Sequence, residues 1–284
     1  MNVLNHKIDF TVILSVSKAN PNGDPLNGNR PRQNYDGYGE ISDVAIKRKI
    51  RNRLQDMGES IFVQSNDRRS DSYESLRDRA EGNEELKKLM KGKGMGEQFA
   101  QEACAAWMDV RSFGQVFAFK GEKSGVSIGV RGPVSIHTAT SVAPIDITSM
   151  QITKSVNSES GKERGSDTMG MKHRVDHGVY VLNGSINTQL AEKTNFTKED
   201  AEKLKQVLMS LFENDASSAR PEGSMEVHKV YWWEHSSKLG QYSSAKVHRS
   251  VTVKPTTEEP KDFSDYEIHL ATLEGLEPEI LDGL

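Results

Sequence analysis

The stretch IDFTVILSV (residues 8–16) decides how the chain folds. Every second residue from Ile8 to Val16 is apolar, and most residues between them are polar, so the period of two predicts a strand with one buried face. A dense group of turn-forming residues, Asn20-Pro21-Asn22-Gly23-Asp24-Pro25, follows this strand. On local chemistry alone the group is interpreted as a structural turn.

A basic helix is predicted after the turn. Ser42 suits an N-cap, and apolar residues recur at helical spacing from Ile46 to Leu54. The same stretch holds five cations against one carboxylate, namely Lys47, Arg48, Lys49, Arg51 and Arg53 against Asp43. A row of cations suits successive phosphates, and the helix start could add an anion site. A solvated helix face is the open alternative, although Arg30 and Arg32 on the preceding loop favour a basic groove.

Two irregular regions interrupt the strand pattern. Residues 58–106 are charged and contain helical patterns, which predicts a mostly helical insertion. Strand patterns return at 112–119 and 126–140, with a turn expected at 121–125. Residues 154–177 are polar and rich in Gly and Ser, and their position between two strand-like segments, 145–152 and 178–190, predicts a protruding hairpin arm. Met169 and Met171 near its far part suit a wedge between bases or into a neighbouring subunit, or packing against their own domain.

The remaining pattern completes an α+β fold. Thr197 and Asp200 have the spacing of a capping box and open an amphipathic helix that reaches Phe212, and residues 225–233 form a further strand pattern. Without the two insertions, the order is strand, helix, strands, helix, strand. This order is typical of a βαββαβ ferredoxin-like core, which RNA-recognition domains also use.

Amino-acid composition says more about the cellular compartment of the protein than about its function. The 284 residues carry 37 basic and 41 acidic side chains, so the net charge of −4 argues against a uniformly basic coat. RNA binding through a local basic cluster stays possible. The single cysteine, Cys104, excludes an intrachain disulfide and a thiolate-rich zinc site, and fits a reducing cytoplasm. No signal peptide or membrane-spanning stretch is expected.

The sequence contains no strong catalytic or metal-binding pattern. Asp24 has no second carboxylate nearby in sequence, so an acid/base or metal role for it is poorly supported. His173 and His177 are four residues apart, but they lie in an expected hairpin, where this spacing does not bring side chains together. Neither a Gly-x-Ser-x-Gly elbow nor a phosphate-binding loop is present. We therefore expect no catalytic residue, no metal and no cofactor.

An ordered set of motifs along roughly residues 1–250 carries a family resemblance. The motifs are NPNGDP (20–25), ISDVAIKRKIRN (41–52), RSFGQVF (111–117), GPVSIH (132–137), DTMG (167–170) and HGVYV (177–181). The set resembles the Csd/Csh branch of CRISPR-associated backbone proteins, and most closely the type I-C Cascade backbone subunit. The resemblance implies a hand-like shape. Its parts are a ferredoxin-like (RRM-like) palm of residues 1–57, 111–150 and 178–250, helical fingers at 58–110, a thumb hairpin at 151–177, and an acidic C-terminal segment at 251–284.

The resemblance also implies a function in antiviral defence. Identical subunits would form a helical filament along the guide RNA (crRNA), and each thumb would displace one base, leaving short runs of bases to pair with target DNA in an R-loop. Further partners would be the crRNA-end-binding and large subunits of the complex. A cytoplasmic location fits this role, and no membrane partner is expected.

Residue roles follow from the same resemblance. Ser42, Lys47, Arg48 and Arg51 would contact guide phosphates, and Met169 with Met171 would form the thumb tip. Gly132, Ser135 and His137 would line the RNA-facing palm. The subunit would not be an enzyme. The alternative is a metal-dependent endoribonuclease that uses Asp24, as in type III relatives, or the Asp176/His177 pair.

Overall fold

The structure is a computed structural model that describes residues 2–91, 94–119, 126–154 and 169–284. Its main sheet is antiparallel, and its strands run in the order β14-β11-β1-β10-β8-β4, with β7 and β9 also pairing with β10. These strands are β1 (Ile8–Ala19), β4 (Tyr38–Ile41), β7 (Val134–Ile136), β8 (Ala139–Pro144), β9 (Ile147–Thr153), β10 (Met169–Ile186), β11 (Met225–Glu234) and β14 (Glu279–Asp282). The fold is therefore a mixture of helices and one large antiparallel sheet.

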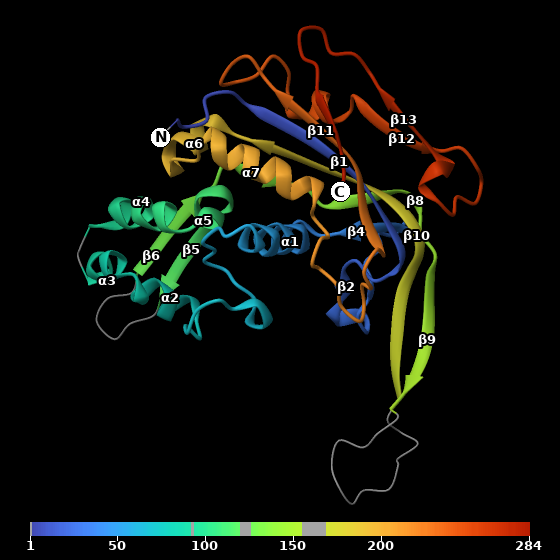
Figure 1. Ribbon diagram of the computed structural model, residues 1–284, viewed down its shortest axis with the longest axis horizontal. Helices are drawn as coiled ribbons and strands as arrows, with labels where there is room; N and C mark the ends of the chain where they lie inside the picture. The colour runs from blue at the N-terminus through green and yellow to red at the C-terminus, as the bar shows by residue number, and fades with distance from the viewer. Residues whose placement is uncertain (1, 92–93, 120–125, 155–168) are drawn as a thin grey trace, which may run out of the picture.

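Helices cover one face of this sheet. Alternate residues of β1, among them Phe10, Val12 and Leu14, point to that face and are buried in the largest hydrophobic cluster. Helix α1 (Asp43–Asp56) contributes Ile46 and Ile50 to the cluster. Helix α7 (Lys198–Met209) packs beside α1 and contributes to the same cluster, as Figure 1 shows. The strands predicted at 8–16 and 225–233 are confirmed, and β1 continues three residues further, to Ala19.

The opposite face of the sheet is covered by the C-terminal part of the chain. Ile13, Val179 and Trp233 of the sheet share a separate hydrophobic cluster with Val247 and Leu276. Their covering elements are α8 (Ser244–His248), β12 (Val251–Pro255) and β13 (Tyr266–Leu270). The acidic segment 251–284 thus packs on the sheet and supplies its edge strand, β14.

A second body is built from residues near 58–131. It contains α2 (Leu76–Gly82), α3 (Glu84–Lys91), α4 (Gly96–Ala106), α5 (Met108–Phe113), β5 (Gly114–Phe119) and β6 (Val126–Arg131). Phe62, Phe99 and Phe117 are fully buried in its own cluster. The β5–β6 hairpin therefore packs with the helices, and this cluster extends beyond the predicted range 58–110.

Three local predictions need correction. Ser112 and Phe113 end α5 rather than begin a strand, because Gly114 adopts a φ of +78° that ends the helix. The pattern at 126–140 is divided among β6, β7 and β8, and the strand pattern at 178–190 begins already at Met169 and gives way to α6 (Thr188–Thr194). The predicted turn 121–125 and residues 155–168 of the arm lie outside the described residues.

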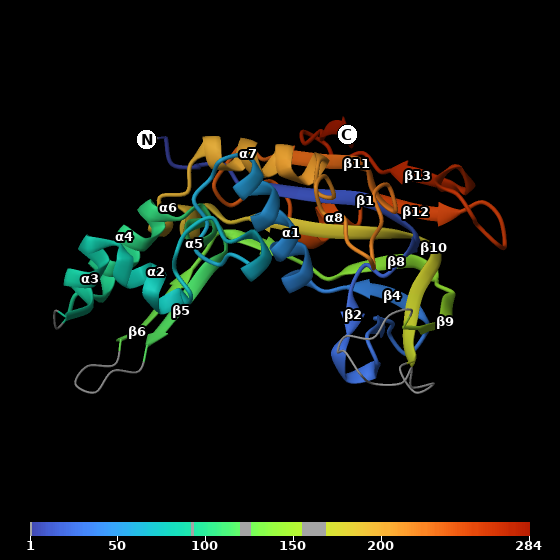
Figure 2. The same cartoon turned by 60° about the horizontal axis from the view of Figure 1, so that its bottom comes forward.

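The short elements complete the chain. The strands β2 (Gly23–Asp24) and β3 (Arg30–Pro31) form a small hairpin, and 3-10 turns occupy Pro25–Asn27, Asn66–Arg68 and Phe263–Asp265. None of the helices in the described parts of the chain combines the length and apolarity that a membrane crossing needs. The second body and the β9–β10 hairpin project from opposite ends of the sheet toward the same side, with α1 between them (Figures 1 and 2).

Candidate nucleic-acid interface

The start of α1 is fixed to the turn that precedes it. The Ser42 hydroxyl accepts a hydrogen bond from the Ala45 amide at 3.3 Å, which confirms the predicted N-cap. The Ser42 amide in turn donates to the Asn22 side chain at 2.9 Å. The turn of residues 20–25 is therefore a structural support for the basic helix, as its local chemistry predicted.

The predicted phosphate-binding cations of α1 already have partners within the chain. Lys47 pairs with Asp43 at 2.9 Å on the surface, where such a pair is weak. Arg48 donates to the Val63 carbonyl at 2.6 Å, and Arg51 donates from Nε to Asp109 at 3.0 Å. Burial, and after it the charge of Arg51, lower the pKa of the Arg48 guanidinium to about 10.

Asp109 organises this end of the site, although no sequence motif marks it. Its carboxylate, 1% exposed, accepts hydrogen bonds from Arg51 and from the amides of Phe62 (2.7 Å) and Val63 (3.0 Å). The Arg51 guanidinium also lies 5.1 Å from the Phe113 ring. Arg48 and Arg51 therefore attach α1 to the second body.

The remaining cations of α1 attach the helix to the loop between α7 and β11. The Lys49 ammonium, which is buried, pairs with Asp215, and Arg53 donates to the Ser210 hydroxyl at 2.9 Å. Burial lowers the pKa of Lys49 to about 8, although the Asp215 charge opposes the shift. The cations of α1 thus mainly anchor the helix, and little of their surface is exposed. The sequence left open a basic groove or a solvated helix face, and the observed arrangement is intermediate between these two alternatives.

Arg30 lies on β3 and Arg32 directly follows this strand, close to the β9–β10 hairpin. Arg30 donates from Nη1 to the Ser149 hydroxyl of β9 at 2.8 Å, and His173 of β10 shares that hydroxyl at 2.8 Å. Arg32 lies 3.4 Å from Asp24, whose carboxylate also accepts from the Leu26 amide. Arg30 therefore connects the loop before α1 to the β9–β10 hairpin.

The tip of the described hairpin carries exposed methionines. Met169 and Met171 pair with Thr153 and Gln151, lie on one face of the hairpin, and are 56% and 55% exposed. Ile152, 51% exposed, pairs with Gly170 and lies on the opposite face. Both faces of this projection thus present apolar side chains to solvent, as an intercalating or docking element would.

The predicted palm residues do not join this surface. Val134 and Ile136 of β7 are buried in the cluster that holds α1, so Ser135 and His137 point to the other face of the sheet. The His137 ring lies 5.4 Å from His248 of α8. Gly132 has a packing role, because a Cβ atom there would lie 2.2 Å from the Ser112 carbonyl oxygen.

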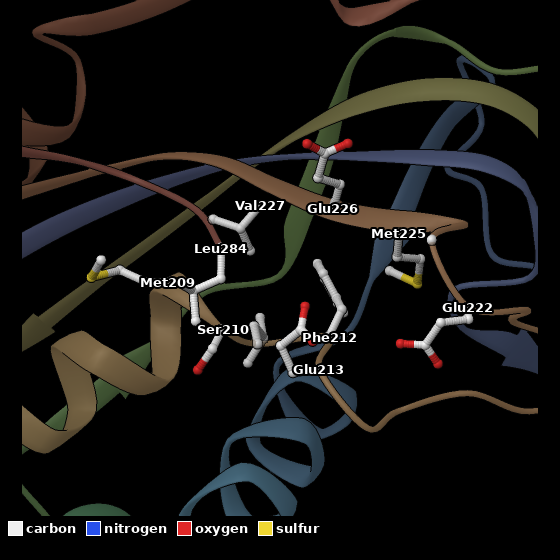
Figure 3. A pocket seen from close by; sticks show the side chains of 11 residues that line it. Met209, Ser210, Phe212, Glu213, Glu222, Met225, Glu226, Val227 and Leu284 are labelled. Atoms are coloured by element: carbon white, nitrogen blue, oxygen red, sulfur yellow. The ribbon is translucent and has the colours of Figure 1, made fainter.

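Two of three cavities in the described structure are lined by several carboxylates, which disfavours RNA there. One of about 260 Å³ lies between the end of α7 and the start of β11, and Glu213 and Glu222 are among the residues that line it, whereas the Glu226 carboxylate points away from it (Figure 3). Another, of about 530 Å³, lies at the hairpin base beside Asp146, Asp176 and Glu258. Both would repel phosphate. The third, of about 630 Å³, lies between α4 and α6 and has Glu97 and Lys193 among its mixed charges.

No group of three or more His, Cys, Asp or Glu side chains in the described ranges is arranged to hold a metal ion. Asp24 caps the 3-10 turn Pro25–Asn27, and His173 and His177 lie on β10 with different neighbours, Ser149 and Tyr266.

Comparison with known proteins identifies relatives of the chain. Residues 6–271 match the family model of "CRISPR-associated protein Cas7". A protein of that description from Haloferax volcanii is 27% identical over 234 residues, which cover 77% of this chain and 67% of that protein.

Two solved structures also match. One is a chain of a "CRISPR RNA-guided surveillance complex", 15% identical, with a TM-score of 0.45 and coverage of 80% of this chain and 68% of that one. The other is a chain of a "CRISPR RNA-guided surveillance complex, pre-nicking", 15% identical, with a TM-score of 0.48 and coverage of 80% of this chain and 75% of that one.

Proposed function

The chain belongs to the CRISPR-associated protein Cas7 family, and from that premise we propose that it is a non-catalytic backbone subunit of a type I-C CRISPR surveillance complex (Cascade). Several copies would polymerise along the crRNA spacer, bind its phosphates, and leave bases free to pair with target DNA. The other partners would be the crRNA-end-binding and large subunits.

The strand order supports the proposed hand-like architecture. Along the chain, β1, β8, β10 and β11 are the first, second, third and fourth strands of a βαββαβ unit. Across the sheet they lie in the order β11-β1-β10-β8, which is 4-1-3-2, and neighbouring strands are antiparallel. This is the order of a ferredoxin-like (RRM-like) palm. The second body would then be the fingers and the β9–β10 hairpin the thumb.

The observation that carries the proposal is the position of α1 between these two projections. Arg48 is held by the uncharged Val63 carbonyl, so its positive charge stays at a fixed position and its side chain loses little entropy when RNA binds. The ion pairs of Arg51 with Asp109 and of Lys49 with Asp215 fix the helix itself. The surface pair of Lys47 with Asp43 is weak enough to exchange its carboxylate for a phosphate.

The proposed RNA surface therefore comprises Arg30, Arg32, Ser42, Lys47, Arg48 and Arg51, with Met169 and Met171 on the hairpin as the base-displacing group. Contact with Ser135 or His137 requires nucleic acid on the opposite face of the sheet, and their role stays a prediction. The Gly132 backbone serves the fold in this proposal.

The test is RNA binding by the full chain and by an Arg30→Ala/Lys47→Ala variant, at several salt concentrations. The control, Arg249→Ala/Lys254→Ala, likewise removes one arginine and one lysine, from exposed positions just after α8 and on β12. Two lost phosphate contacts on a single strand predict a log–log salt slope shallower by about 1.4 and an affinity about 25-fold lower at 0.1 M salt. The control should bind like the wild type.

Equal affinities of the two double variants would refute the placement of RNA on α1. The same reactions, run on a denaturing gel with and without divalent cations, test the non-catalytic role. Metal-dependent cleavage that Asp24→Ala abolishes would establish the ribonuclease alternative instead.

A further inference from the structure

Lys18 has a backbone conformation that its side chain disfavours. Its φ is +51°, in the left-handed region. Three other non-glycine residues of the described ranges have positive φ, and all three are asparagine: Asn29, Asn195 and Asn214. Asparagine tolerates this region because its short polar side chain can bond locally, whereas lysine has no such compensation.

The surrounding contacts impose this conformation. On one side of Lys18, the Ser17 amide donates to the Ser224 carbonyl at 2.8 Å, and on the other the Asn20 amide donates to the Ala219 carbonyl at 2.9 Å. The ladder with β10 pairs Ser17 with His177 and then Ala19 with Val175, and it passes over Lys18. The backbone at Lys18 is thus held from both sides, which is the condition under which strain persists.

The lysine side chain is exposed at this position. Within the described part of the chain, its ammonium makes no hydrogen bond or ion pair, whereas the cations of α1 are all bonded. Because glycine or asparagine would fit the backbone at lower cost, the positive charge is the property that lysine supplies here and these two residues lack.

The position of Lys18 connects it with the proposed RNA surface. It lies where β1 ends and the β9–β10 hairpin leaves the sheet. Two residues after Lys18, the Asn20 side chain donates to the Asn29 carbonyl, beside Arg30. The Asn22 side chain accepts from the amide of Ser42, the N-cap residue of α1. Lys18 therefore lies between the hairpin base and the start of the basic helix.

We propose that Lys18 is an RNA-binding residue whose ammonium contacts a phosphate on the side of the β9–β10 hairpin base that faces α1, away from the acidic cavity that the C-terminal segment covers on the opposite face. This inference rests on the proposed function, since it adds a contact to the same RNA surface. The strained backbone fixes the point from which the side chain leaves the sheet, so the charge is presented at the junction of hairpin and helix.

The test uses Lys18→Asn and Lys18→Gly, both of which suit a positive φ, with Lys18→Arg to restore the charge and Lys254→Asn as an exposed-lysine control on β12. One lost contact predicts RNA affinity about fivefold lower at 0.1 M salt and a salt slope shallower by about 0.7. The melting temperatures of the Asn and Gly variants should equal or exceed that of the wild type, since the strain is relieved. Lys18→Arg and Lys254→Asn should bind like the wild type.

The outcomes separate this inference from the function on which it rests. If the wild type binds RNA and Lys18→Asn binds equally well with the same slope, Lys18 is not an RNA contact, while the proposed function stands. If both neutral variants melt well below the wild type, the residue is structural and the inference fails. If the wild type does not bind RNA at all, the proposed function fails and this inference fails with it.

Discussion

Removing the carboxylate of Asp109 should detach the basic helix from the second body. Asp109→Ala leaves the Arg51 guanidinium, 13% exposed, without its partner and removes the acceptor of two backbone amides, those of Phe62 and Val63. An uncompensated buried charge costs about 3–5 kcal/mol, and each unsatisfied buried amide about 1–3 kcal/mol. Because water and relaxation reduce such sums, we expect a loss of about 4–6 kcal/mol, a large part of the stability of a typical domain.

Urea unfolding monitored by tryptophan fluorescence suits this measurement, because Trp107 lies in the second body, 4.6 Å from the Phe62 ring, and Trp232 and Trp233 lie in the sheet. The ion pair itself is isolated by adding Arg51→Met in both backgrounds. Arg51→Met should cost about 1–3 kcal/mol less in the Asp109→Ala protein than in the wild type, since its partner is already gone. Effects that add within about 0.5 kcal/mol would show that the two side chains do not stabilise each other and would refute this account of α1.

Two further predictions concern Lys49 and Gly132. Burial holds the pKa of Lys49 at about 8 in the folded protein, below its ordinary 10.5, so the unfolded chain keeps this proton to higher pH and the free energy of unfolding should rise between about pH 8 and 10.5. Lys49→Met should lack this part of the rise when urea unfolding of both proteins is compared at pH 7.5 and 10, and identical pH dependence would contradict the assignment. Gly132→Ala should destabilise the protein by at least about 2 kcal/mol in the same assay, because the new methyl group would overlap the Ser112 carbonyl. Gly129→Ala in β6, where an added Cβ meets nothing within 4 Å, is its control and should stay within about 0.5 kcal/mol of the wild type.

Features that depend on local spacing were predictable from the sequence. The alternation from Ile8, the Ser42 cap and the Thr197–Asp200 capping box are all present in the structure. In the capping box, Asp200 accepts from the Thr197 amide at 2.9 Å although glutamate is the more usual residue there. Each of these features is decided by residues within a few positions of one another.

Features that depend on distant partners were not predictable. Nothing near Arg51 in the sequence indicates that it pairs with Asp109, 58 residues further along the chain. The side of the sheet to which Ser135 points is set by β7 pairing with the end of β10, which no motif records. The positive φ of Lys18 was likewise not predictable, because a single positive φ changes no hydrophobic period.

The separation of the two hydrophobic clusters has a consequence for how the molecule opens. Phe62, Phe99 and Phe117 belong to a cluster different from that of the sheet, and directed polar contacts such as Arg51–Asp109 and Arg111–Asp200 help to join the second body to the rest. Cooperative unfolding units tend to follow such divisions. The second body is thus suited to exchange its amide hydrogens in brief excursions during which the strands of the sheet stay protected, so its amides would report opening at α1 before any global loss of structure.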